Sequence, residues 1–171
     1  MIKIVLFEPE KPANTGNIIR TCQAFNASLT IIGNITFDLS DEALRRAQMD
    51  YAIGFNVERE KTIDSFLKKN DIEKGYFITR YGNNVYSETD FSDYKKDIWL
   101  MFGKESTGIP LKILNKYQNR CLRIPIVFSA RSLNLANSVS IIISEIARQQ
   151  NFHFLSIKEE IKTPNHIKDI S

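Results

Sequence analysis

The amino-acid sequence predicts an α/β fold with a mostly parallel sheet flanked by helices. Short apolar, β-branched runs alternate with stretches of helical period, and 171 residues are enough for one domain of this kind. In such folds the ligand binds beyond the carboxyl ends of the strands. A binding site is therefore expected in the loops that follow the strands.

The first unit is a strand, a helix and a second strand. Residues 2–7 are a β-branched run that must end before Pro9 and Pro12, because proline cannot sit in a central strand. Asn14 is placed to cap the helix that follows, and residues 29–32 form the next buried run. This order is typical of a βαβ unit.

Further helices and strands follow along the chain. Helices are predicted over residues 41–47, 62–69, 110–117 and 133–150. Strands are predicted over residues 76–79, 98–102 and 121–126. Residues 81–94 are polar and ambiguous. We expect a single domain over residues 1–155 and a charged tail over residues 156–171.

The composition indicates a globular protein from a reducing compartment. The net charge of +3 permits a polyanionic partner without requiring one. Cys22 and Cys121 lie in apolar patterns and share no metal-ligand spacing, so buried free thiols are expected. His153 and His166 also lack ligand spacing, and we expect no metal. We find neither a signal peptide nor a membrane-spanning run, and expect a cytoplasmic protein that makes no membrane contact.

The segment NTGNIIR, from Asn14 to Arg20, is the first of three candidate site motifs. Gly16 allows a close turn at a helix start, Asn14 and Asn17 offer amides, and Arg20 follows about one turn later. One interpretation is a site for an anion near the helix N-terminus. The other is a capped helix with a solvated arginine, and the spacing alone leaves both open.

The second motif, FGKESTGIP over residues 102–110, ends a buried strand. Gly103 and Gly108 have the spacing of a phosphate-binding P-loop, but Ile-Pro stands where that loop requires Lys-Ser or Lys-Thr. This excludes an ATP-hydrolysing loop, and no GxGxxG dinucleotide fingerprint is present. The alternative is a glycine-rich turn in which Glu105 is merely solvated.

The third motif, RSLNLANSVSI over residues 131–141, gathers polar side chains at the head of an otherwise apolar helix. Such residues serve either as helix caps or as partners of a ligand. Arg131 adds a fixed positive charge in front of the helix.

Taken in order, these motifs resemble the SPOUT superfamily of RNA methyltransferases. The pattern is NxGNxxR, FGxExxGIP, the IPI run of residues 124–126 and RSLNLANSVSI, and it spans nearly the whole chain. Within the superfamily the chain is most similar to the tRNA (cytidine/uridine-34-2′-O)-methyltransferase group, also in the stretches VLFEPEKPANTGNIIR and LRRAQMDY. The resemblance implies a carboxyl-terminal trefoil knot and transfer of methyl from S-adenosyl-L-methionine to the ribose 2′-hydroxyl of wobble nucleotide 34 of tRNA.

The resemblance also assigns a role to individual residues. The cofactor would be contacted by Ile78, Thr79, Gly103, Ile124, Ile126, Ser132 and Leu133. Arg20 would be catalytic, Asn14, Asn17 and Arg131 would shape the acceptor side, and Glu105 and Asn134 would support the site.

Members of this group act as homodimers, and the partner RNA would be the tRNA anticodon loop. The last predicted helix offers an apolar face for the contact between copies, which consists of Leu135, Val139, Ile142, Ile143 and Ile146. One position departs from the group, because Ser144 stands where relatives commonly have tyrosine. Two alternatives stay open: a 2′-O-methyltransferase of ribosomal RNA, and a non-catalytic RNA-binding protein of the same fold.

Overall fold

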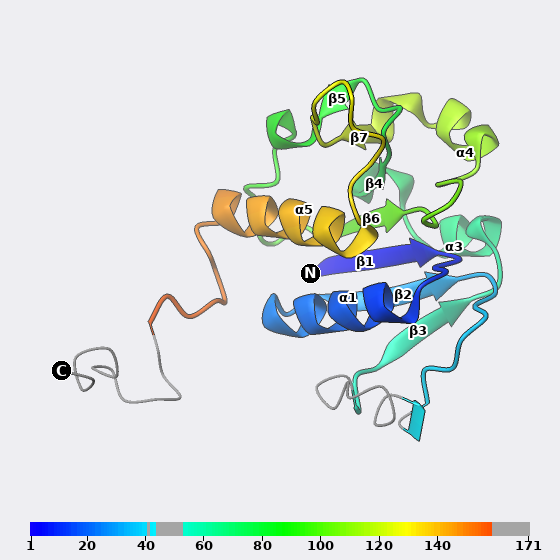
Figure 1. Ribbon diagram of the computed structural model, residues 1–171. Coiled ribbons are helices and arrows are strands. Elements are labelled where there is room, and N and C mark those ends of the chain that lie inside the picture. The colour runs from blue at the N-terminus through cyan, green and yellow to red at the C-terminus, as the bar shows by residue number, and fades with distance from the viewer. Residues whose placement is uncertain (41, 44–52, 159–171) are drawn as a thin grey trace.

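A computed structural model of the protein describes residues 1–40, 42–43 and 53–158. Within these residues the strands form one seven-stranded sheet in the order β3-β2-β1-β6-β4-β7-β5, and all neighbours are parallel (Figure 1). The strands are β1 Ile2–Phe7, β2 Ser28–Ile32, β3 Val57–Glu60, β4 Gly75–Ile78, β5 Asn84–Val85, β6 Ile98–Phe102 and β7 Cys121–Arg123. The predicted α/β class with a parallel sheet is confirmed.

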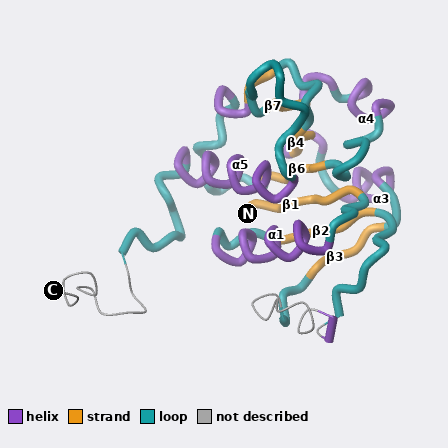
Figure 2. Tube along the Cα trace, in the orientation of Figure 1, coloured by secondary structure: helices purple, strands orange, loops and turns teal. Residues whose placement is uncertain are grey.

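Helices cover both faces of this sheet, as Figure 2 shows. On one face lie α1 (Pro12–Ala24) and α5 (Leu135–Gln149), and on the other lie α3 (Ile63–Lys69) and α4 (Leu111–Lys116). Short 3-10 helices occur at Ile72–Lys74, Tyr86–Glu88 and Gln118–Arg120. In the described part of the chain, no helix is long and apolar enough to cross a membrane.

The alternation of side chains along β1 explains this three-layer packing. Ile4 and Leu6 are buried in the cluster beneath α1 and α5, whereas Val5 is buried in the cluster beneath α3 and α4. Successive residues of a strand point to opposite faces, so a strand that is apolar throughout is covered on both sides. The helices therefore leave the edge formed by the strand ends open for a ligand.

Several predicted elements are confirmed, and some are corrected. The predicted strands over residues 2–7 and 98–102 coincide with β1 and β6. The helix α1 begins at Pro12, so the prediction that Asn14 caps it is wrong. The strand β3 was missed because its sequence, VERE, has a single apolar residue. The predicted helix over residues 41–47 lies almost wholly outside the described residues.

The elements near the third motif begin and end differently from the prediction. The strand predicted over residues 121–126 ends at Arg123, and residues 124–126 form a loop, because Pro125 cannot donate a ladder hydrogen bond. The last helix begins after Asn134, whose side chain accepts hydrogen bonds from the backbone N–H groups of Ala136 and Asn137. Its apolar stripe is buried in the protein's own core, so the prediction that this face meets a second copy is wrong.

The two cysteines are buried free thiols, as predicted. Burial raises the pKa of the Cys22 thiol to about 12 and also raises the pKa of Cys121. Only thiolates react quickly with disulfide reagents. We therefore expect the folded protein to show no fast reaction with a thiol reagent at pH 8, and both cysteines to react once urea unfolds it. Fast reaction of one cysteine thiol in the native protein would contradict this burial.

The carboxylate of Glu145 is stabilised by hydrogen bonds from Arg148 and then Gln149, which lower its pKa from 4.5 to about 2. The stability that it contributes is fully present above pH 4.5 and is lost as the pH falls toward 2. We expect wild-type protein to exceed Glu145→Gln in urea midpoint at pH 6 and the two midpoints to converge near pH 2. A difference that is independent of pH would contradict this assignment.

Candidate active site

Three loops at the carboxyl edge of the sheet are joined by one chain of hydrogen bonds. Glu105, in the loop after β6, accepts a 2.8 Å bond from the side-chain amide of Asn14 in the first turn of α1. The side-chain oxygen of Asn14 accepts a 2.9 Å bond from the amide of Asn134, which precedes α5. Each of the three sequence motifs contributes one member to this chain, which we call the Glu105–Asn14–Asn134 chain.

Glu105 also caps α1 from outside that helix. Its carboxylate accepts bonds from the backbone N–H groups of Glu10 (2.8 Å) and Lys11 (3.3 Å). The helix begins with Pro12 and has neither an acidic residue in its first turn nor a side-chain cap of its own. A carboxylate at this position is stabilised by the helix dipole. The helix N-terminus that the sequence suggested as an anion site is therefore occupied by the protein's own Glu105.

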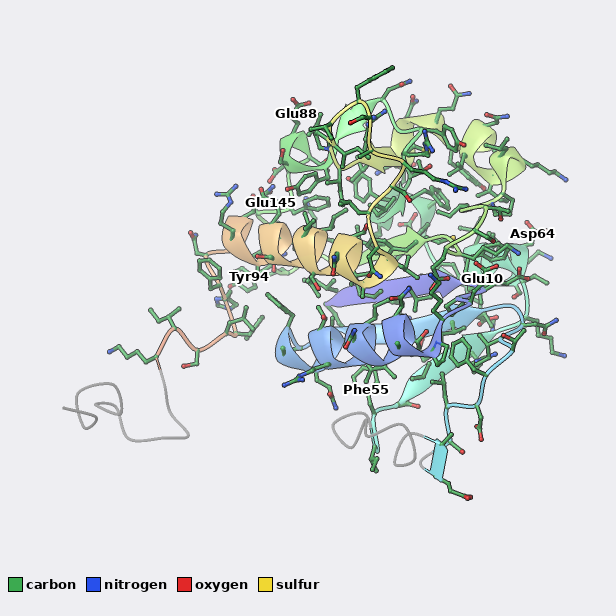
Figure 3. The ribbon with its side chains drawn as sticks, viewed as in Figure 1. Glu10, Phe55, Asp64, Glu88, Tyr94 and Glu145 are labelled. Atoms are coloured by element: carbon green, nitrogen blue, oxygen red, sulfur yellow. The ribbon has the colours of Figure 1, made fainter. Side chains whose placement is uncertain are left out.

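A second clamp joins the same two loops in the opposite direction. The Glu10 carboxylate accepts bonds from the backbone N–H (2.8 Å) and hydroxyl (2.7 Å) of Ser106, which lower the pKa of Glu10. Lys104 pairs with Glu8 at 2.9 Å, and this bond raises the pKa of Lys104. Figure 3 shows Glu10 beside the arrowhead of β1, at the carboxyl edge.

The loop after β6 closes tightly on itself at Gly103. A Cβ atom at this position would lie 2.2 Å from the backbone nitrogen of Ile109 and 2.4 Å from the carbonyl carbon of Gly108. Both obstacles are backbone atoms, and Gly108 has a left-handed φ of 74°. Only glycine fits this close approach. The loop is thus a rigid, backbone-lined turn.

These loops surround a cavity of about 570 Å³ at the carboxyl edge. Nine of the predicted site residues line it: Asn14, Ile78, Thr79, Gly103, Glu105, Arg131, Ser132, Leu133 and Asn134. Ile124 and Ile126 follow β7 but are not part of its lining. A cavity of this size suits a nucleoside-sized ligand.

Comparison with known proteins gives a family for this arrangement. The model of the SpoU rRNA Methylase family matches residues 1–144. The chain belongs to this family. A protein from Geobacillus stearothermophilus, provisionally named a tRNA (cytidine(34)-2′-O)-methyltransferase, is 44% identical over 155 residues, which cover 91% of this chain and 99% of the relative.

Solved structures agree with the membership of the SpoU family. One comes from work on 2-OH methylation of C/U34 on tRNA, and it has a TM-score of 0.76 and 30% identity over 89% of this chain and 97% of its own. An AdoMet-bound rRNA methyltransferase from Sinorhizobium meliloti has a TM-score of 0.74 and 28% identity over 91% of this chain and 57% of its own.

Two further predicted residues of this SpoU family member, besides Ile124 and Ile126, lie outside the cavity lining. Arg20 and Asn17 line a separate hollow of about 400 Å³ on the outer side of α1, together with Asn137 and Ser140 of α5. Ser140 is also 3.3 Å from the hydroxyl of Thr21, which ties the two helices together. A single chain therefore does not bring Arg20 into the cavity that holds Gly103.

The sequence motifs missed part of the cavity lining. Arg80 and Tyr81 line it directly after Thr79, and Lys11 and Lys104 add positive charge. Arg80 and Tyr81 could have been found, because they follow a predicted strand at its carboxyl end. The charge of Lys104 is already paired with the carboxylate of Glu8. Among the described residues, no group of three or more His, Cys, Asp or Glu side chains could hold a metal ion.

We expect Glu105→Ala to loosen the cavity and to destabilise the protein. The substitution removes the acceptor of two backbone N–H groups and of the Asn14 amide. We expect it to lower the free energy of unfolding by about 2 kcal/mol and the melting temperature by roughly 5 °C. Calorimetry would measure the melting temperature and titration the affinity for S-adenosyl-L-methionine, and both should fall. Glu88→Ala, at an exposed position remote from the cavity, is the matched control. Equal behaviour of the two variants would contradict the role of Glu105.

Proposed function

We propose that the protein transfers a methyl group from S-adenosyl-L-methionine to the ribose 2′-hydroxyl of the cytidine or uridine at position 34 of tRNA. The observation that carries this proposal is the cavity that three loops form around Gly103. The chain belongs to the SpoU family, and the match to a relative named for C34 methylation covers 91% of this chain. The structure related to C/U34 methylation, with 30% identity and nearly full coverage, supports the same substrate.

The cavity residues fit S-adenosyl-L-methionine. Ile78 and Leu133 offer apolar contact for an adenine ring, while Thr79 and Ser132 offer hydroxyls for the ribose and the amino acid part. Gly103 keeps the loop narrow and presents backbone groups to the ligand. Ile124 and Ile126 would complete this set through the loop that follows β7. When bound, the cofactor supplies a methyl group that is activated by its sulfonium charge.

The remaining work of the protein is positioning and electrostatics. Arg20 carries a permanent guanidinium charge, which can hold an RNA phosphate and favour loss of the proton from the 2′-hydroxyl. Asn17 lies beside it in the same hollow, and Arg131 supplies a second charge at the cavity. In-line alignment of hydroxyl and methyl group lowers the barrier by removing the entropy of the encounter.

A homodimer would bring the hollow that holds Arg20 close to a cavity around Gly103. The outer side of α1 and α5 is exposed at Arg20, Asn17, Asn137 and Ser144, and it includes the hollow that holds Arg20. We propose that a second copy packs against this side, so that Arg20 and a cavity around Gly103 face the same anticodon loop. Ser144, where relatives commonly have tyrosine, lies on this side, so the contact must form without that ring.

A trefoil knot in the carboxyl-terminal half is part of the same proposal. The turn after β4 lies directly across β7, because a Cβ atom on Gly82 would be only 2.8 Å from the backbone of Leu122. The backbone N–H of Thr79 donates a 2.9 Å bond to the carbonyl of Leu122 at this crossing. From β7 the chain continues through residues 124–134 to α5, and in the proposed knot this segment would pass through the loop that follows β4.

A ribosomal RNA substrate is the second candidate. It is favoured by the name of the SpoU rRNA Methylase family and by the AdoMet-bound rRNA methyltransferase, although this chain covers only 57% of the latter protein. A nucleotide in an anticodon loop is unpaired and accessible, which suits a small catalytic domain. A third candidate, a protein that binds RNA without methylating it, predicts cofactor binding and no transfer.

We expect Arg20→Ala to reduce methyl transfer to tRNA by about a hundredfold, because it removes a charge that acts on the acceptor. Affinity for S-adenosyl-L-methionine should stay within a few-fold, since Arg20 lies outside the cavity around Gly103. The measurement uses labelled cofactor, bulk tRNA and mass spectrometry of the labelled nucleotide. Lys112→Ala, an exposed cation on α4, is the control.

Each outcome of this experiment selects one candidate. Label at position 34 that depends on Arg20 supports the proposal, whereas label only in ribosomal RNA supports the second candidate. Bound cofactor without any transfer supports the non-catalytic protein. Loss of cofactor affinity in Arg20→Ala would contradict the assignment of Arg20 to the acceptor side.

A further inference from the structure

A second and larger cavity, about 730 Å³, lies on the opposite edge of the sheet. It is lined by Met1 and Ile2 at the start of β1, Ser28 at the start of β2 and Glu58 near the start of β3. None of the residues assigned above to the cofactor or to the acceptor lines it. Figure 3 shows Tyr94 at this amino edge and Glu10 at the carboxyl edge.

Aromatic rings form much of the wall of this cavity. Phe25 and Phe55 line it from the ends of α1 and of the loop before β3, and Tyr94 and Phe154 line it from the other side. Tyr94 stacks on His153 with ring centroids 3.8 Å apart, and Phe154 lies edge-on to both rings. Phe154 is nevertheless 75% exposed, so an apolar ring faces solvent at the cavity mouth.

The segment after α5 holds these rings in a strained backbone. Asn151, Phe152 and Phe154 have left-handed φ values of 51°, 54° and 68°, and none of them is glycine. Left-handed φ is unusual for a bulky residue, and such strain is often found at ligand sites. The turns are fixed by backbone bonds, among them one of 2.7 Å from Phe152 to the carbonyl of Ala147. Phe154 is therefore held in a defined position at the cavity mouth.

Polar and charged groups complete the lining. Lys95 and Lys96 follow Tyr94, and the amides of Asn26, Asn56 and Gln150 line the cavity. Lys95 lies 6.0 Å from the centre of the Tyr94 ring. The hydroxyl of Ser28, which also lines the cavity, is buried and has no hydrogen-bond partner within the described part of the chain.

We propose that this cavity binds one unpaired nucleotide of the substrate RNA, with its base against Tyr94 and Phe154 and its phosphate toward Lys95 and Lys96. Exposed aromatic rings beside lysines are the recurring means of holding single-stranded nucleic acid, because every base has a face that stacks. The amides of Asn26 and Asn56 can bond to base edges. A purely apolar ligand would make no use of these two amides.

The inference rests on the proposed function for the identity of the RNA. A catalytic domain of this size has few places to grip a tRNA, and the two cavities lie at opposite edges of one sheet. A strand of five or six residues spans about 17–20 Å, so an RNA that reaches both cavities contacts the protein well beyond the target nucleotide. The second contact would add affinity without touching the reacting atoms.

The first test compares tRNA affinity among surface variants by fluorescence anisotropy, without cofactor and at several salt concentrations. Phe154→Ala should raise Kd about tenfold, because stacking on one aromatic ring is lost. Lys95→Ala/Lys96→Ala should raise Kd and reduce the slope of log K against log salt by about 1 to 2. Phe152→Ala, in the same strained segment but outside the cavity lining, and Lys68→Ala/Lys112→Ala, on other helices, are the matched controls and should bind as wild type.

The second test irradiates the complex of wild-type protein and tRNA at a wavelength that crosslinks bases to aromatic side chains, and then maps the crosslinks by mass spectrometry. A crosslink at Tyr94, His153 or Phe154 supports the proposal. Crosslinks confined to the carboxyl edge, together with wild-type Kd for Phe154→Ala, overturn it.

Failure of this inference and failure of the proposed function give different results. If Phe154 governs tRNA affinity but position 34 gains no methyl group, the proposed function fails and the nucleotide site stands. If methylation proceeds and Phe154→Ala binds tRNA as wild type, the nucleotide site fails alone. A Phe154→Ala variant that changes sedimentation while keeping its tRNA affinity also overturns the proposal, because the cavity is then a contact between copies.

Discussion

The carboxylate of Glu105 at the start of α1 is the interaction on which the carboxyl edge depends. It binds two backbone N–H groups and the Asn14 amide, and through Asn14 it reaches the residue that caps α5. Removing one partner would leave buried Asn14 with an unpaired amide as well as exposing the end of a helix dipole. The loop after β6, α1 and α5 therefore form one unit, which borders the cavity around Gly103.

Local sequence rules could not show this interaction. Asn14 follows two prolines at a helix start and looks like a cap, yet the helix begins earlier and the cap comes from a residue 91 positions away. Rules for capping and turns describe neighbours in sequence. The same limit applies to Arg20. It belongs to the same sequence motif as Asn14, but in the fold it lies on the outer side of α1.

Where the sequence was sufficient, strong local patterns decided the outcome. β1 and β6 are continuous apolar runs in the middle of the sheet, and the carboxyl ends of these and the neighbouring strands brought Thr79, Gly103 and Ser132 to one cavity as predicted. The strand β3 was not predicted from the sequence because an edge strand needs few apolar residues, and the sequence VERE is mostly polar. His153 and Phe154 lie before the predicted tail, and they pack on Tyr94 through contacts that no local pattern reports.

The two cavities share the same two helices, and this gives them different electrostatics. α1 and α5 begin at the carboxyl edge and end at the amino edge, where Phe25 and Gln150 line the second cavity. At the carboxyl edge Glu105 neutralises the positive end of α1, whereas α5 is capped by the uncharged Asn134, so its positive end adds to Arg131. At the amino edge both helices present their negative ends, which disfavours a phosphate. A nucleotide there must therefore be held chiefly by its base, with Lys95 and Lys96 offsetting the helix ends, and this is the arrangement that the exposed ring of Phe154 suits.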